Sequence, residues 1–217
     1  MTKHFRAPVM VAALMALSAC GIFRGGGPKK TPTVGQRVPI LAAETGVEAD
    51  PTLANIPVQL PPAAVNAAWA QPGGSAAKSN GQLALGASLT RAWTATINGG
   101  SNRERLGAPP VIADGKLFVV DVQGTAKAFD AATGRALWSR DLPDTEENRP
   151  SRFGGGVSYD EGKVYATDGL GDVLALNAAD GAVLWRAKPG GPLRGAPTIA
   201  NGAVYVLTQD NQVFALN

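Results

Sequence analysis

Side chains suited to nucleophilic or acid–base chemistry are scarce in this chain. Its 217 residues include one cysteine, Cys20, and one histidine, His4. A single cysteine cannot form an intramolecular disulfide, and without a later histidine most catalytic triads, general acid–base pairs and zinc sites lack their usual member. The acids of the C-terminal part fall mostly in sequences typical of turns, such as Asp114, Asp160 and Asp172. We therefore expect no catalytic residue, no metal site and no cofactor.

The sequence around Cys20 indicates lipid attachment. Residues 9–17 form an apolar run that is too short to span a bilayer, and positively charged residues precede it. The run leads into Leu17-Ser18-Ala19-Cys20, which resembles the bacterial lipobox. We expect residues 1–19 to be a signal peptide and Cys20 to be acylated, which anchors a chain to a membrane; an ordinary signal peptide followed by a chance cysteine is the alternative. Gly21 replaces the aspartate that commonly retains such lipoproteins at the inner membrane, which implies the periplasmic face of the outer membrane.

Residues 20–84 have the composition of a tether. They are rich in proline, glycine and alanine and show no sustained period of 2 or 3.6 residues. Trp69 is unusual for such a linker and predicts that its neighbourhood docks on the domain that follows. Lys29 and Lys30 lie near the acylated end, where they either contact anionic lipid headgroups or are simply solvated.

The charge of the chain does not favour nucleic acid as a partner. The formal net charge is +3, but part of it lies in the expected signal peptide. From residue 84 onward we count 13 basic and 14 acidic side chains. A basic surface that follows a phosphate backbone is therefore not expected.

A sequence repeat organises the C-terminal part of the chain. Residues 128–138 return as residues 175–185, which is 47 positions later, and the motif begins again at residues 215–217. Each copy predicts a short apolar strand, a turn with a glycine, and a second strand that ends in tryptophan. A two-stranded unit cannot bury its own faces, so the repeat predicts units that are stable only when stacked on their neighbours.

The full repeat unit has the pattern of a four-stranded antiparallel meander. Asp-Gly and Asn-Gly pairs mark the first turn, because a type I′ hairpin needs positive φ at both central residues. Units of this length predict the blades of a β-propeller over residues 85–217. We place the blades at about residues 107–142, 153–188 and 195–217, and expect residues 88–97 to be an outer strand that closes the ring. We expect one tryptophan of each outer strand to pack between adjacent blades: Trp93, Trp138 and Trp185.

A known family carries this repeat. The motif Ala-x-Asp-x-x-Thr-Gly-x-x-x-Trp, complete at residues 128–138 and varied at 175–185, resembles the repeat of the quinoprotein-like, or pyrroloquinoline-quinone-like (PQQ-like), eight-bladed propellers. Together with the lipobox and the tether, the chain is similar to the propeller lipoproteins of the β-barrel assembly machinery. The resemblance implies a non-catalytic scaffold that binds the periplasmic POTRA domains of the barrel-forming subunit and assists assembly of unfolded outer-membrane proteins.

One local match to the family concerns a partner contact. The family has a Leu-Arg-Gly turn between blades that contacts the barrel-forming subunit, and Leu193-Arg194-Gly195 stands in the corresponding place. The resemblance therefore implies partner-binding roles for Leu193 and Arg194. The chain departs from the family at Gly191, where a further leucine is usual. Arg105 and Arg152 occur in similar loops, so Arg194 could also be a solvated loop residue.

Two other functions remain open on the sequence alone. A quinoprotein dehydrogenase shares the repeat, but it needs a convergent set of Asp, Glu and Asn side chains and often a pair of cysteines. Another membrane-anchored propeller, such as a sensor ectodomain, is the second alternative. Two blades and most of a third cannot close a ring, so we expect the chain to be part of a longer protein. We expect its blades to form an open wedge with exposed apolar faces, and the strand at residues 88–97 to lack its proper partners.

Overall fold

The structure is a computed structural model that describes residue 35, residues 50–144 and residues 148–217. It divides into two units, Met1–Pro57 and Val58–Asn217. Cys20, the expected lipidation site, lies outside the described residues. Within the described ranges, no helix is long and apolar enough to cross a membrane.

The described part of the first unit contains one turn of helix. This 3-10 helix, η3 (Pro51–Leu53), begins after Asp50, whose carboxylate accepts a hydrogen bond from the Thr52 backbone N–H at 2.9 Å. Proline suits the start of a helix because it has no N–H to leave unpaired there.

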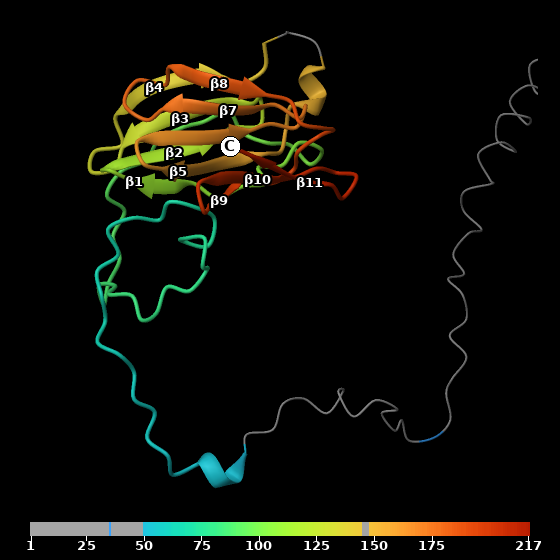
Figure 1. Ribbon diagram of the computed structural model, residues 1–217. Helices are drawn as coiled ribbons and strands as arrows, with labels where there is room; N and C mark the ends of the chain where they lie inside the picture. The colour runs from blue at the N-terminus through green and yellow to red at the C-terminus, as the bar shows by residue number, and fades with distance from the viewer. Residues whose placement is uncertain (1–34, 36–49, 145–147) are drawn as a thin grey trace, which may run out of the picture. The chain divides into compact units, whose positions relative to one another are not determined.

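The second unit is all-β and consists of three antiparallel sheets (Figure 1). The first sheet contains β1 (Val111–Ala113), β2 (Lys116–Val120), β3 (Thr125–Asp130) and β4 (Ala136–Asp141). The second contains β5 (Gly156–Asp160), β6 (Lys163–Thr167), β7 (Val173–Asn177) and β8 (Val183–Ala187), and a short helix, η4 (Arg149–Ser151), precedes it. The third contains β9 (Thr198–Ala200), β10 (Ala203–Leu207) and β11 (Val213–Leu216). The strands pair in sequence order, which confirms the predicted meander blades.

The first hairpin of each blade has the predicted turn. Asp114 and Gly115 have φ of 48° and 66°, and Asn201 and Gly202 have φ of 52° and 77°. A right-handed helical or extended residue at these positions would splay the two strands, which is why Asp-Gly and Asn-Gly pairs occur here. The turns set the register, with Ala113 opposite Lys116 in the first blade and Ala200 opposite Ala203 in the third.

The cores lie between blades. Strand β7 shows this clearly, because its alternate side chains point to opposite faces and both faces are buried. Leu174 and Leu176 join the cluster shared with the first blade, which includes Phe118. Val173 and Ala175 join the cluster shared with the third blade. The second blade is therefore stabilised by packing on both of its neighbours, as expected for a repeat architecture.

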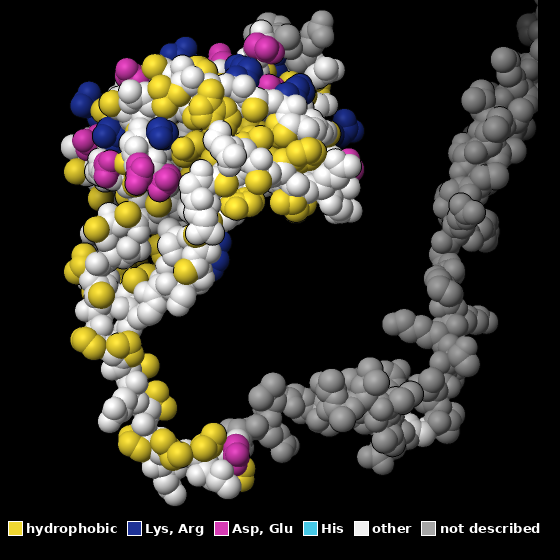
Figure 2. Space-filling model, viewed as in Figure 1, with side chains coloured by type: hydrophobic (Ala, Val, Ile, Leu, Met, Phe, Trp, Pro, Cys, Tyr) yellow, Lys and Arg dark blue, Asp and Glu magenta, His cyan; other side chains and the backbone are white. Residues whose placement is uncertain are grey.

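The third blade presents an exposed apolar face. Leu207 and Val213 are 59% and 69% exposed. The equivalent position to Leu207 in the first blade, Val120, is 5% exposed because the second blade covers it. Figure 2 shows hydrophobic side chains across the surface above β10 and β11. Apolar side chains that are buried in the first blade are thus open in the third.

The segment 88–97, the expected closing strand, lies without strand partners in the described part of the chain. None of its residues has ladder hydrogen bonds to a described strand. The partners of a closing strand belong to a last blade, and the sheets of the described residues are those of β1–β4, β5–β8 and β9–β11. Side chains hold the segment instead: the Trp93 indole N–H donates to the Ala131 carbonyl at 3.0 Å, and Asn98 donates to Asp121 at 2.7 Å.

Candidate functional site

The repeat motif builds a contact between successive blades. The indole N–H of Trp138, on β4 of the first blade, donates a hydrogen bond to the Ala178 carbonyl of the second blade at 3.1 Å. The Trp138 ring lies directly over Gly181, where an added Cβ would be 2.7 Å from ring atom Cε3. Only glycine fits under this ring, and its φ of 72° is also one that other residues rarely adopt.

Trp93 makes the same contact one blade earlier. Its indole donates to Ala131, and a Cβ on Gly134 would lie 2.6 Å from its ring. Trp185, the third tryptophan of the set, packs on Tyr165 of its own blade with ring centroids 6.0 Å apart. The position equivalent to Ala131 and Ala178 would follow Asn217, the last residue of the sequence. Two of the three tryptophans thus contact a neighbouring segment of the chain in the same way.

Asp130 of the motif closes the turn that carries the glycine. Its carboxylate accepts hydrogen bonds from the backbone N–H groups of Ala132 at 3.1 Å and Thr133 at 2.8 Å. The hydrogen bond from the Thr133 hydroxyl, followed by these backbone bonds, lowers the pKa of the Asp130 carboxyl. In the second blade the Asn177 side chain accepts from the Ala179 N–H at 2.8 Å. The motif therefore turns the chain and docks a tryptophan.

The loops between blades form one surface, which we call the loop face. In a four-stranded meander the β2–β3 type of turn and the connections between blades lie at the same ends of the strands. The loop face comprises Glu104, Val122, Gln123, Pro150, Arg152, Phe153, Leu193, Arg194 and Gln209. The β1–β2 and β3–β4 types of turn lie at the opposite ends.

Arg194 is the exposed cation of the loop face with the most defined geometry. Its Nη1 donates to the Phe153 carbonyl at 2.6 Å, and its guanidinium carbon lies 4.6 Å from the centre of the Phe153 ring. A weaker contact joins its Nε to Gln209 at 3.4 Å. A guanidinium that is held by a carbonyl and an aromatic ring keeps its remaining N–H groups aimed outward, which suits a carboxylate.

Leu193 has a different environment. It is 0% exposed and belongs to the cluster between the second and third blades. Its backbone pairs with Thr208 as an isolated antiparallel bridge. In this conformation its side chain contributes to the packing of the blades and is not accessible to a partner, so the proposal below places no partner contact on Leu193.

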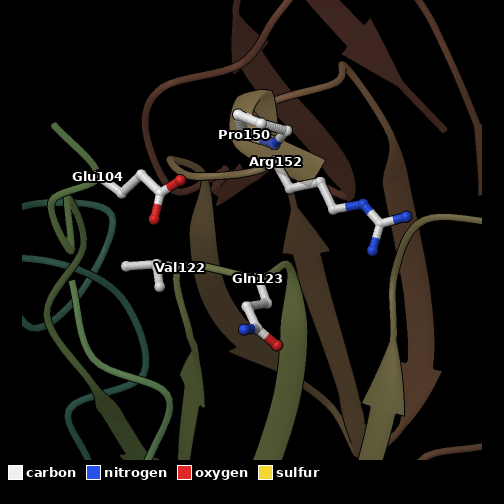
Figure 3. A pocket seen from close by; sticks show the side chains of 5 residues that line it. All are labelled: Glu104, Val122, Gln123, Pro150 and Arg152. Carbon is white, nitrogen blue, oxygen red and sulfur yellow. The ribbon is translucent and has the colours of Figure 1, made fainter. Parts of the chain in front are cut away.

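A small pocket lies in the loop face between the first and second blades (Figure 3). It has a volume of about 130 Å³ and is lined by Glu104, Val122, Gln123, Pro150 and Arg152. Figure 3 shows the Arg152 side chain extending away from Glu104. Among the described residues, no group of three or more His, Cys, Asp or Glu side chains is arranged to hold a metal ion.

Two buried aspartates occupy equivalent turns of the loop face. One oxygen of Asp121 accepts from the N–H groups of Gln123 and Thr125, at 3.0 and 3.1 Å. One oxygen of Asp168 likewise accepts from Leu170 and Asp172, each at 3.0 Å. The two sites differ at the second oxygen.

The second oxygen of Asp121 has partners and that of Asp168 has none. Lys127 lies 3.1 Å from Asp121, and Asn98 donates to the same oxygen. Asp168 is 0% exposed, and its Oδ2 has no hydrogen-bond partner among the described residues. Burial raises the pKa of the Asp168 carboxyl above its ordinary value of 3.8, and the nearby Asp172 charge adds to this; the turn N–H groups and Lys188 oppose it.

We predict that Asp168→Asn and Asp121→Asn have opposite effects on thermal stability. Because the folded-state pKa of Asp168 is raised, this residue favours folding at a pH below the ordinary carboxyl pKa of 3.8. This contribution to stability is lost as the pH rises through the folded-state pKa. Asp168→Asn keeps the turn acceptor and removes the buried charge, so it is expected to raise Tm at pH 7 and to have little effect near pH 3.5. Asp121→Asn breaks a partnered charge and is expected to cost about 1–3 kcal/mol at pH 7. Thermal unfolding of both variants across this pH range checks the prediction, and equal losses at pH 7 would contradict it.

Residues 69–71 lie along the free edge of the first strand of each blade. We call the unpaired edges of β1, β5 and β9 the inner edges, because these three strands lie against one another. Trp69 pairs with Ile112 of β1, the Ala70 carbonyl accepts from Tyr159 of β5, and the Gln71 side chain bonds to Ile199 of β9. Sequence reasoning expected docking near Trp69 but missed Gln71. A polar amide between an alanine and a Pro-Gly-Gly turn was the available signal.

The comparisons with known proteins identify a family model that matches residues 80–151 and 123–217, described as outer membrane protein assembly factor BamB. A curated relative, the outer membrane protein assembly factor BamB of Aliivibrio fischeri, is 33% identical over 69 residues. That match covers 32% of this chain and 17% of the relative.

Solved structures of PQQ enzymes share the fold. The quinohemoprotein alcohol dehydrogenase of Comamonas testosteroni matches with a TM-score of 0.55 and 25% identity, over 66% of this chain and 23% of the enzyme. The BamB structure from Moraxella catarrhalis matches with a TM-score of 0.39 and 24% identity, over 46% of this chain and 28% of that protein. The chain therefore spans less than a third of the length of each of these proteins.

Proposed function

We propose a scaffolding function for this chain from the premise that it belongs to the family of the outer membrane protein assembly factor BamB, since the family model matches more than half of its residues. In this proposal the chain is a non-catalytic lipoprotein of the outer membrane. It binds the POTRA domains of the barrel-forming subunit and assists the assembly of unfolded outer-membrane proteins.

The observation that carries the proposal is the geometry of Arg194. The residue is exposed on the loop face, and the Phe153 carbonyl and ring fix its orientation. Preorganised arginines beside aromatic rings are typical of protein interfaces, because little side-chain entropy is lost on binding. An acidic side chain on the periplasmic domain of the partner is the complementary group.

The environment of the inner edges supports a non-catalytic function over a quinone enzyme. In a propeller the first strands surround the central channel, where a cofactor can be held. Here the backbone groups on the inner edges are hydrogen-bonded to residues 69–71 of the same chain. They belong to Ile112, Tyr159 and Ile199. These groups do not fit a quinone, which needs polar side chains that are free to bind it.

Membrane attachment through Cys20 is part of the same proposal. Acylation of a cysteine that becomes the N-terminus gives more than one lipid chain, and two chains are enough for stable anchoring. The uncharged run between Asp50 and Lys78 then separates the anchor from the blades. A different membrane-anchored propeller would share this anchor, so the partner decides between the two.

We predict that Arg194→Glu weakens binding to the isolated POTRA domains by at least about tenfold. The substitution replaces a preorganised cation with a negative charge, which repels the acidic group of the partner. Arg135→Glu is the matched control: it makes the same charge reversal on an exposed arginine in the β3–β4 turn, at the opposite ends of the strands. Titration calorimetry or co-purification measures both variants. Unchanged binding by Arg194→Glu, or equal losses for the two variants, would count against the proposed contact.

A further inference from the structure

The contacts of residues 69–71 follow the repeat of the blades. Ile112, Tyr159 and Ile199 occupy the same position in the first, second and third blades, at the middle or end of β1, β5 and β9. Trp69 bonds to the first, Ala70 to the second and Gln71 to the third. Three consecutive residues therefore contact three equivalent sites, one blade for each residue.

The bonds are direct and lie at short distances. The Trp69 N–H donates to the Ile112 carbonyl at 2.6 Å, and the Ile112 N–H donates back at 2.9 Å. The Tyr159 N–H donates to the Ala70 carbonyl at 2.7 Å. On the third blade the side-chain amide of Gln71 pairs with the strand edge as a backbone amide would. Its Oε1 accepts from the Ile199 N–H at 3.1 Å, and its Nε2 donates to the Ile199 carbonyl at 2.8 Å. Gln71 is 6% exposed, so water does not compete freely for these bonds.

The chain turns away immediately after the third contact. The backbone groups of Gln71 and Gly74 bond to each other at 2.8 and 3.2 Å, and Pro72 has no N–H to extend the pairing. Asn80 holds this turn, because its Nδ2 donates to the Gly73 carbonyl at 3.1 Å and its side chain packs on Gly74. In Figure 1 the loop that contains these residues runs beside β1 and β9.

We infer that residues 69–71 form a strap that couples the inner edges of the three blades, so that the edges are released together. β1 and β9 have three residues each, so their sheets alone hold them with few hydrogen bonds. The strap pairs edge groups that would otherwise be open to water or to strand addition by another chain. The strap also fixes the tether to three blades at once. This inference goes beyond the proposed scaffolding function and does not depend on that function.

Hydrogen exchange in the full chain with the substitution Gln71→Ala tests the strap. The substitution removes the two bonds to Ile199 directly and leaves the acceptors of the Ile112 and Tyr159 N–H groups in place. A coupled strap predicts that all three amides exchange about tenfold faster, because they open in one event. Acceleration at Ile199 alone would overturn the inference, since the three contacts would then be independent.

Two further variants separate the strap from general destabilisation. Asn80→Ala loosens the turn without touching any bond to a blade and is expected to accelerate the same three amides. Gln82→Ala, at an exposed glutamine nearby, is the matched control and is expected to change none of them. Amides within β6 and β7 are expected to keep their rates in every variant. If those central amides accelerated as much as the three edge amides, the strap would not be a separate unit and the inference would fail.

Discussion

Replacing Trp138 with alanine is expected to lower the free energy of unfolding by about 3–5 kcal/mol. The substitution removes a large ring from between two blades and the indole hydrogen bond to Ala178. It also removes one of the two ring neighbours of Phe118, since the Trp138 centroid lies 5.9 Å from that of Phe118 and Tyr159 remains. Trp138 is partly buried against the cluster between the two sheets, and this packing limits how far neighbouring side chains can move into the space that the ring leaves. Urea or thermal unfolding measures the loss.

Trp185→Ala is the comparison for Trp138→Ala. Trp185 has the equivalent position in the second repeat, but its described ring contact is with Tyr165 of its own blade. The substitution is therefore expected to cost less than Trp138→Ala. A midpoint shift near zero for Trp138→Ala, or equal shifts for the two variants, would contradict the docking function of the tryptophan.

Gly181→Ala is expected to destabilise the protein by about 2–5 kcal/mol, because two costs combine. The positive φ of 72° disfavours alanine by about 1–2 kcal/mol. The new Cβ also lies 2.7 Å from the Trp138 ring and must displace it, at a cost of about 1–3 kcal/mol. Equilibrium unfolding of the variant measures the sum.

Gly162→Ala isolates the backbone cost. Gly162 has φ of 77° but no atom within 4 Å of an added Cβ, so alanine there meets only the conformational penalty. Combining Gly181→Ala with Trp138→Ala completes a double-mutant cycle, in which the steric part should disappear. If Gly181→Ala cost no more than Gly162→Ala, or if its cost persisted without Trp138, the ring contact would not be the cause.

The turns and blades could be predicted because their causes are local. Asp114-Gly115 and Asn201-Gly202 specify a tight hairpin from the preferences of two residues. The short continuous apolar run of β7 is typical of a strand that is buried on both faces, and the repeated motif shows that the same unit recurs. The closing strand expected at residues 88–97 stays a prediction, because such a strand needs the inner strands of a further blade, and alternation within the segment carries no information about that blade.

The candidate site was less predictable because its properties depend on distant neighbours. Leu193 and Arg194 are adjacent in sequence, yet one is enclosed between two blades and the other is held outward by Phe153. Asp121 and Asp168 occupy equivalent turns, yet only Asp121 meets a lysine and an asparagine. A repeat alignment assigns both members of such a pair the same environment.

The tryptophan-glycine motif distinguishes what the sequence alone determines from what only the tertiary structure determines. By itself the sequence determined the strands, the turns, the glycine with positive φ and the recurrence of the tryptophan, because each follows from backbone preferences over a few residues. Only the tertiary structure decided that Trp138 lies on Gly181 of the next blade and that Trp69, Ala70 and Gln71 each bond to a different blade. These contacts join residues far apart in the chain, so they depend on how whole blades stack.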